Sequence, residues 1–139
     1  MTDDLERFVT EQNRDYETVL AELRRGRKSS HWIWFIFPQI GGLGSSEMSR
    51  HYAIGSLDEA RAYLAHPVLG PRILACAAAV MSVDGQSAVE ILGSVDAVKL
   101  RSSVTLFHRA APDEPVFRQV LDRYFHGVPD PATDERLSP

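Results

Sequence analysis

A glycine-rich stretch with two serines, Gly41-Gly42-Leu43-Gly44-Ser45-Ser46, is the first candidate for a binding site in this chain. Glycines allow positive φ angles and a close approach to the backbone, and the first turn of a helix offers free N–H donors to an anion. We therefore expect Gly42, Gly44 and Ser46 to bind an anionic group. The alternative is a plain turn between two helices.

Known catalytic and phosphate-binding fingerprints are missing from the sequence. The glycine stretch lacks the Lys-Ser/Thr ending of a P-loop and follows no clear strand of a βαβ unit. The five histidines do not show the i, i+4 spacing of metal ligands, and there is no G-x-S-x-G elbow. These patterns argue against nucleotide hydrolysis, hydride transfer and serine hydrolysis, and we predict neither a metal nor a cofactor.

A lysine and two hydroxyls share one face of a helix that we predict over residues 95–107. Lys99, Ser102 and Ser103 follow the three- and four-residue spacing of a helix face. If this face is buried, the Lys99 ammonium needs an anion, either Asp96 or a ligand, because an unpaired buried charge is too costly. The alternative is a solvated rim, where Lys99 extends its charge into water.

The segment Trp32-Ile33-Trp34-Phe35-Ile36-Phe37 precedes the glycine stretch and contains both tryptophans of the chain. Such a segment forms the central core of a helical domain, or it is core on one face while Trp34 lines a pocket for a flat ligand. Gln39, Tyr52 and Arg72 complete the predicted ligand-binding set, together with Trp34, Lys99 and Ser103. Any proton transfer would fall to Lys99, Asp96 or His31, and the sequence does not decide whether the chain is an enzyme.

Composition limits the other classes of function. The chain has 139 residues and a formal net charge of −4, which disfavours binding to nucleic acid. Its longest uncharged apolar run, residues 73–81, is about half of a membrane span, and the acidic N-terminus is not a signal peptide. We predict a cytoplasmic protein that binds neither nucleic acid nor membrane, with Cys76 as a buried thiol.

Apolar residues at helical spacing predict an all-α fold. A long amphipathic helix covers residues 3–25, and helices follow up to Gly127, while segment 29–37 is ambiguous between a helical turn and a strand. The predicted N-caps are Asp3, Ser45 or Ser46, Ser56, Ser87 and Asp113. We expect one compact orthogonal domain over residues 1–127 with a central buried aromatic segment, and a tail, 128–139, that drapes over the surface or frays.

Many of these residues belong to a set that is typical of one protein family. They are Trp34-Phe35-Ile36-Phe37-Pro38-Gln39, Gly42-Leu43-Gly44-Ser45-Ser46, Tyr52-Ala53-Ile54, Glu59-Ala60, Tyr63-Leu64, His66-Pro67, Leu69-Gly70, Arg72, Leu92-Gly93, Asp96, Lys99 and Ser102-Ser103-Val104-Thr105-Leu106-Phe107. With this set the chain resembles the Domain of Unknown Function 1810 family over roughly residues 5–127. At Val104 the family pattern has methionine.

The resemblance implies a compact helical domain of bacterial cytoplasmic type and no established activity. In helix order more than in residues, the chain is also similar to helical proteins that process NAD or ADP-ribose adducts. Two hypotheses follow. The chain binds, or also processes, a small anionic ligand such as a nucleotide or ADP-ribose derivative, or it is a non-catalytic protein-interaction module with an exposed aromatic patch.

Overall fold

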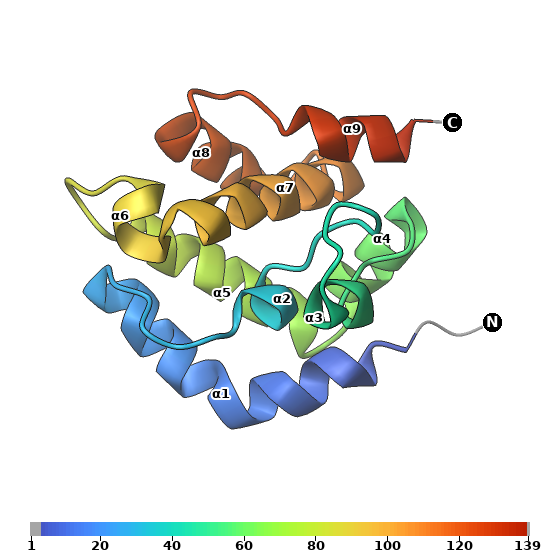
Figure 1. The fold of residues 1–139 in the computed structure, drawn as a ribbon, viewed down its shortest axis with the longest axis horizontal. Coiled ribbons are helices and arrows are strands. Elements are labelled where there is room, and N and C mark those ends of the chain that lie inside the picture. The colour runs from blue at the N-terminus through green and yellow to red at the C-terminus, as the bar shows by residue number, and fades with distance from the viewer. Residues whose placement is uncertain (1–3, 139) are drawn as a thin grey trace.

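Nine helices follow one another along residues 4–138, the part of the chain that the computed structural model describes (Figure 1). They are α1 (Glu6–Arg25), α2 (Ile33–Ile36), α3 (Glu47–His51), α4 (Leu57–Ala65), α5 (Leu69–Met81), α6 (Ala88–Leu92), α7 (Ser94–Ala110), α8 (Pro115–Tyr124) and α9 (Pro131–Leu137). Within the described residues, β pairing is limited to one bridge, between Ile40 and Ile54. Consecutive helices α4 and α5 meet at 91°. The predicted all-α orthogonal fold is confirmed.

Serine side chains begin three of the helices, as predicted. Ser46, Ser56 and Ser87 each accept a hydrogen bond from the backbone N–H three residues later, at the starts of α3, α4 and α6. At α6 the Glu90 side chain returns a bond to the Ser87 N–H and completes a capping box. Local sequence signals therefore set these three boundaries.

Two other predicted caps have a different outcome. Asp3 lies outside the described residues, and α1 begins at Glu6 without a side-chain cap. The prediction for Asp113 is wrong, because Glu114 occupies the N-cap position of α8 and makes no side-chain capping bond. Pro115 in the first position explains why α8 needs less capping, since proline has no N–H to satisfy and has its φ already fixed.

The aromatic segment forms the short helix α2 and the residues around it, in the middle of the molecule. Figure 1 shows α2 between α1 and α7, and it packs against both. Trp32, Phe35 and Phe37 are each at most 2% exposed, whereas Trp34 is half-buried. The segment is therefore the central core that the sequence predicts, with one tryptophan at the edge of that core.

Helix α7 is the other central element. It packs against α4, α6, α8 and α9, and every residue from Ser102 to Phe107 is buried. The helix continues to Ala110, past the predicted end at Phe107. Because it contacts so many elements, α7 positions side chains from both halves of the chain.

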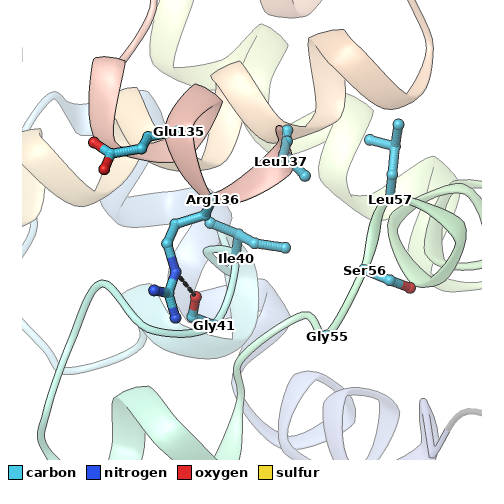
Figure 2. Close-up of a pocket in the computed structure, with 8 residues that line it drawn as sticks. All are labelled: Ile40, Gly41, Gly55, Ser56, Leu57, Glu135, Arg136 and Leu137. Carbon is cyan, nitrogen blue, oxygen red and sulfur yellow. Dashed lines mark hydrogen bonds between the residues drawn. The ribbon is translucent and has the colours of Figure 1, made fainter. Parts of the chain in front are cut away.

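The C-terminal segment 128–139 contains a helix, α9, that the sequence did not lead us to expect. Asp130 caps its start and Pro131 occupies its first position. Arg136 Nε donates a hydrogen bond of 3.1 Å to the carbonyl oxygen of Gly41 (Figure 2). The end of the chain therefore contacts the glycine-rich loop in front of α3.

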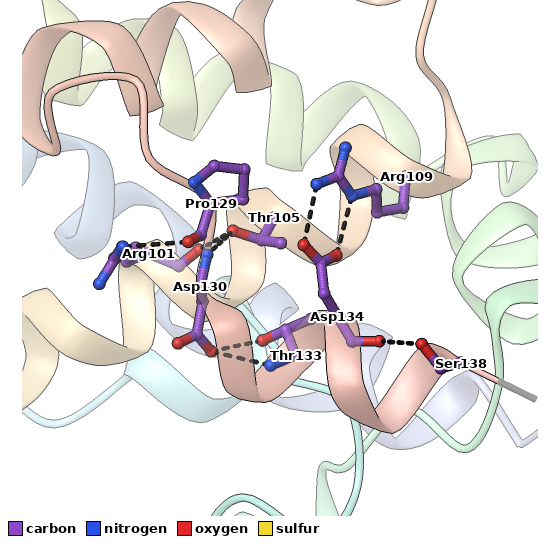
Figure 3. A network of polar contacts seen from close by, with 8 residues as sticks. All are labelled: Arg101, Thr105, Arg109, Pro129, Asp130, Thr133, Asp134 and Ser138. Atoms are coloured by element: carbon purple, nitrogen blue, oxygen red, sulfur yellow. Dashed lines mark hydrogen bonds and ion pairs between the residues drawn. The ribbon is translucent and has the colours of Figure 1, made fainter.

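Polar contacts fix α9 on α7 (Figure 3). The Arg109 guanidinium donates two hydrogen bonds of 2.9 Å to the Asp134 carboxylate. The Thr105 hydroxyl accepts a bond of 2.9 Å from the Asp130 N–H, and the Ser102 hydroxyl donates one of 2.8 Å to the Asp130 carboxylate. Ser102 therefore binds the start of α9. It does not join Lys99 and Ser103 as the shared helix face led us to expect.

Within residues 4–138, no single helix is both long and apolar enough to cross a membrane. Helices α4 and α5 meet that criterion only when they are counted together, across their bend.

Close packing of α4 on α5 generates the first prediction. A Cβ atom at Gly70 would lie 2.1 Å from the backbone carbonyl oxygen of Leu64, which cannot move without distorting α4. We expect Gly70→Ala to lower the free energy of unfolding by about 2–4 kcal/mol, although alanine favours a helix by about 1 kcal/mol. Chemical denaturation measures the change.

Gly41→Ala is the matched control, because the added Cβ would meet no atom closer than 3.6 Å. This variant should remain within about 0.5 kcal/mol of the wild-type stability. Equal stability of the two variants would contradict the close helix contact.

Candidate functional site

The predicted ligand-binding residues lie in three regions of the structure. Gly42, Gly44 and Ser46 lie on the loop before α3. Trp34, Arg72, Lys99 and Ser103 lie on α2, α5 and α7. Gln39 and Tyr52 lie next to the Ile40–Ile54 bridge.

The glycine-rich loop is engaged by the protein itself. Gly42 has a φ of +96°, and a Cβ there would lie 1.7 Å from a guanidinium nitrogen of Arg136. At Gly44 a Cβ would lie 2.5 Å from the Ser49 hydroxyl oxygen. The Ser46 hydroxyl caps the five-residue helix α3. The close approach of Arg136 and Ser49 to the backbone therefore explains why glycine occupies positions 42 and 44.

A cavity of about 490 Å³ opens beside this loop (Figure 2). It lies between the Ile40–Gly41 backbone, the start of α4 at Ser56 and Leu57, and the last turn of α9 at Arg136. Gly41 belongs to the glycine stretch, but the predicted ligand-binding residues do not line this cavity. The cavity is thus separate from the place where Lys99 and Arg72 lie.

Gln39 and Tyr52 serve the core. The Gln39 carbonyl oxygen accepts a hydrogen bond of 2.9 Å from the Ile54 N–H, as part of the bridge. The Tyr52 ring is 6% exposed and lies 5.6 Å from the Phe8 ring and 5.7 Å from the Phe35 ring, between centroids. Packing and backbone pairing account for both residues.

Trp34 and Lys99 meet at the edge of the core, in the region formed by α2, α5 and α7. The Lys99 ammonium lies 5.0 Å from the centre of the Trp34 ring, a cation–π distance. Among residues 4–138, no carboxylate lies within ion-pair distance of that ammonium. The indole nitrogen of Trp34 is buried and has no hydrogen-bond partner in the described chain. Lys99 thus keeps its charge available beside an unpaired N–H donor.

Arg72 packs where α5 faces α1. Its guanidinium lies 4.9 Å from the centre of the Tyr16 ring, and Nη2 donates a hydrogen bond of 2.9 Å to Asn13 Oδ1. The other terminal nitrogen, Nη1, is buried and has no partner in the part of the chain described. Arg72 therefore also presents an unpaired, charged donor.

The helix positions after Lys99 and the side-chain contacts of Tyr63 connect α7 to α1, on which Arg72 packs. Ser103 lies one helical turn after Lys99 on α7, and Phe107 lies one turn after Ser103. The Phe107 ring packs 5.2 Å from the Tyr63 ring. The Tyr63 hydroxyl in turn accepts a hydrogen bond of 3.0 Å from Gln12 Nε2.

Gln12 is bonded to the segment that carries Trp34 and is the sequence neighbour of the residue that binds Arg72. Its Nε2 also donates to the carbonyl oxygen of Phe35, the neighbour of Trp34, at 2.6 Å. Gln12 precedes Asn13, the partner of Arg72, and lies one turn before Tyr16 on α1. The residues with unpaired buried atoms here are Gln12 (Oε1), Trp34 (Nε1), Arg72 (Nη1) and Ser103 (Oγ). Together with Lys99 we call these residues the polar cluster.

Gln12 is not among the residues predicted from the sequence to bind a ligand. A signal was present, because Gln12 lies four residues after Phe8 and four before Tyr16, on the apolar stripe of α1. A polar side chain within such a stripe must find buried partners, which here are Phe35 and Tyr63. Gln12 is 1% exposed.

Two potentially reactive groups near the cluster are held in their protonated forms. Burial raises the pKa of the Cys76 thiol to about 12, against a weaker opposing effect of Arg72. Burial likewise raises the pKa of the Tyr63 hydroxyl above its usual value. Cys76 is therefore the buried thiol that the sequence predicts, and neither group is an anion at neutral pH.

The remaining catalytic candidates lie elsewhere. Asp96 forms an ion pair of 2.9 Å with Lys28, not with Lys99. Lys28 also lies over the Trp32 ring, at 5.0 Å from its centre, so this pair belongs to the packing of the aromatic segment. His31 is exposed. Within residues 4–138, no three His, Cys, Asp or Glu side chains gather as a metal site would need.

A buried carboxylate, Glu22, fixes the approach to α2. Its oxygens accept hydrogen bonds from the Ser29 N–H (2.8 Å), the Ser30 N–H (3.1 Å), the Ser30 hydroxyl (2.6 Å) and the Trp32 indole N–H (2.9 Å). Burial raises the pKa of Glu22, but these hydrogen bonds outweigh burial and lower the pKa to about 2. Glu22 is therefore a charged structural group and not an acid–base catalyst.

Comparison with known proteins agrees with the helical fold. A family model described as "Protein of unknown function (DUF1810)" matches residues 2–137. The crystal structure of the conserved hypothetical protein Rv1873 from Mycobacterium tuberculosis is similar, with a TM-score of 0.95 and 48% sequence identity, over 96% of this chain and 96% of that chain. No curated protein matches the chain. These similarities support the fold and do not indicate an activity.

The Glu22 contacts predict a specific loss of stability in acid. Because the pKa of Glu22 is lowered from 4.5 to about 2 on folding, its ionised form stabilises the protein above pH 4.5, and this contribution disappears as the pH falls towards 2. We expect Glu22→Gln to cost about 2–3 kcal/mol at pH 7 and to make unfolding less dependent on pH between 4.5 and 2. Urea denaturation at several pH values measures both effects.

Glu17→Gln removes an exposed carboxylate from the same helix and is the control. It should keep the wild-type stability and acid dependence. A Glu22→Gln variant with the same acid dependence as wild type would show that Glu22 is not the group responsible.

Proposed function

The chain belongs to the protein family of unknown function DUF1810, and within this family we propose that it binds a small anionic ligand at the polar cluster. One observation carries the proposal. Three buried donors, on Trp34, Arg72 and Ser103, have no acceptor within the described chain, and the Lys99 ammonium lies 5.0 Å from the centre of the Trp34 ring.

Buried donors without an acceptor destabilise the protein. A buried polar atom without a partner costs about 1–3 kcal/mol, and more when it is charged. Two of the groups, Lys99 and Arg72, are cations, so the missing acceptor is best supplied by an anion. Both side chains are half-buried, as is Trp34, so part of the cluster is exposed at the protein surface.

Phosphorylated ligands suit this set of donors best. The donors belong to α2, α5 and α7 and approach from different helices, and the oxygens of a phosphate can accept from several directions at once. We therefore propose a ligand of the nucleotide or ADP-ribose class. If the ligand is also processed, Lys99 is the group available for proton transfer, because Asp96 is bound to Lys28.

A protein-interaction role remains the second candidate, on a different surface from the one expected. The aromatic segment cannot form an exposed docking patch, since Trp32, Phe35 and Phe37 are buried. The exposed large apolar side chains include Val95 (66%) and Val98 (62%), which lie three residues apart at the start of α7. Such a pair favours an interaction surface there.

Ligand binding is tested with the wild-type protein and two charge variants. ADP-ribose, AMP and pyrophosphate at millimolar concentration should raise the melting temperature of the wild type, because a ligand that binds only the folded state stabilises it. We expect Lys99→Gln and Arg72→Gln each to weaken binding about tenfold or more, since each removes a charged donor. Isothermal titration calorimetry gives the affinities.

Arg61→Gln is the control for charge, because Arg61 lies on the exposed face of α4 and pairs only locally with Asp58. It should bind like wild type. If none of the three compounds shifts the melting temperature of the wild type, the ligand proposal fails and the α7 surface becomes the better candidate.

A further inference from the structure

Gln12 indicates a chemical feature of the ligand that the cations Lys99 and Arg72 do not indicate. Its amide orientation is fixed, because the nitrogen donates to two acceptors, the Phe35 carbonyl oxygen at 2.6 Å and the Tyr63 hydroxyl at 3.0 Å. The amide oxygen therefore points away from both of these bonds. That oxygen, Oε1, is buried and has no donor within the described chain.

The polar cluster thus contains an acceptor among its donors. The Ser103 hydroxyl does not satisfy Gln12 Oε1, since both atoms are without a partner in residues 4–138. A bare, fully ionised anion would accept from Trp34 and Arg72 but would leave Gln12 Oε1 unsatisfied. A ligand that carries a hydroxyl group near its charge satisfies both kinds of atom.

We propose that the polar cluster binds a phosphate monoester with a neighbouring hydroxyl, as in a sugar phosphate, and that Gln12 is its specificity-determining residue. The phosphate oxygens accept hydrogen bonds from Trp34, Arg72, Ser103 and Lys99, while a ligand hydroxyl donates to Gln12 Oε1. This inference rests on the proposed function and adds to it the part of the ligand that is uncharged.

The location of Gln12 supports its place beside the phosphate donors. It contacts Phe35, which follows Trp34 in the chain, and its neighbour Asn13 binds Arg72. Through Tyr63 and Phe107 it is also connected to the α7 face that carries Ser103 and Lys99. Sites built to accept a hydrogen bond from a ligand discriminate strongly against analogues without that donor, because the buried acceptor is then left unpaired.

The experiment compares three ligands on the wild-type protein by calorimetry. Ribose 5-phosphate carries the phosphate and hydroxyls, pentyl phosphate carries the phosphate alone, and ribose carries hydroxyls alone. A pH of 8 keeps both phosphates doubly ionised, since their second pKa is about 6. We expect ribose 5-phosphate to bind at least tenfold more tightly than pentyl phosphate, and ribose alone to bind more weakly than either.

Two variants assign the preference to Gln12. Gln12→Met removes the acceptor, so the ratio of the two phosphate affinities should fall below about threefold. Gln12→Glu keeps an acceptor at this position, so the preference for ribose 5-phosphate should persist while both affinities fall through charge repulsion. Because Gln12 also bonds to Phe35 and Tyr63, circular dichroism confirms that each variant is folded before its ratio is used.

The outcomes separate the two proposals. If the wild type binds both phosphates with equal affinity, the role of Gln12 is overturned while anion binding stands. If it binds neither phosphate, anion binding is overturned and the inference falls with it. A preference for ribose 5-phosphate that survives in Gln12→Met would assign the hydroxyl contact to another residue. Since the ligand comparison uses the wild type, a variant that fails to fold does not remove the test.

Discussion

The arrangement of the core depends on one buried carboxylate, Glu22, at the end of α1. It is 4% exposed and accepts four hydrogen bonds from residues 29–32, the segment that leads into α2. A charged acceptor with this many donors fixes the position of the backbone far more firmly than apolar contact could. Beside it, the Lys28 N–H donates to the Ile91 carbonyl oxygen at 2.8 Å, and the Lys28 ammonium pairs with Asp96. The turn after α1 is therefore tied to both α6 and α7.

The position of α2 follows from this turn and determines what the polar cluster contains. With Trp32 held by Glu22, the next turn of chain presents two neighbouring residues to different surroundings. Trp34 meets Lys99 on α7, while the Phe35 carbonyl oxygen meets Gln12 on α1. A helix of a single turn can do this because its last carbonyl groups have no intrahelical partner, so the Phe35 carbonyl oxygen is free to accept while the Trp34 side chain extends away from the helix axis. The residues of the cluster lie on four helices, α1, α2, α5 and α7, and one of these, α2, has almost no helical stability of its own.

Local chemistry explains which parts of the fold were predictable. The serine caps and the apolar stripes of α1, α5 and α7 are properties of a few neighbouring residues, so their helices could be predicted. The state of segment 29–37 depends on Glu22 and Lys28 from outside it, and α9 is fixed by partners such as Arg109 that lie far away in sequence. For the same reason Trp34, Arg72, Lys99 and Ser103 could be identified as candidates by residue type, whereas their separation from the glycine loop could not. Nothing in the sequence near Gly42 indicates that Arg136 covers it.

Helix α9 also has a consequence for how the chain folds and opens. Its contact between Arg136 and Gly41 joins residues 95 positions apart, so the loop-closure entropy must be overcome before the contact forms. Within α9 the fully buried side chain is the polar Thr133, Leu137 packs on the core while only partly buried, and Asp134 is held by the ion pair with Arg109. Elements with few buried apolar contacts undergo local unfolding at lower free energy than the core. We accordingly expect the amide hydrogens of α9 to exchange through local opening, which would break its bonds to Arg109 on α7 and move Arg136 away from the backbone of Gly42.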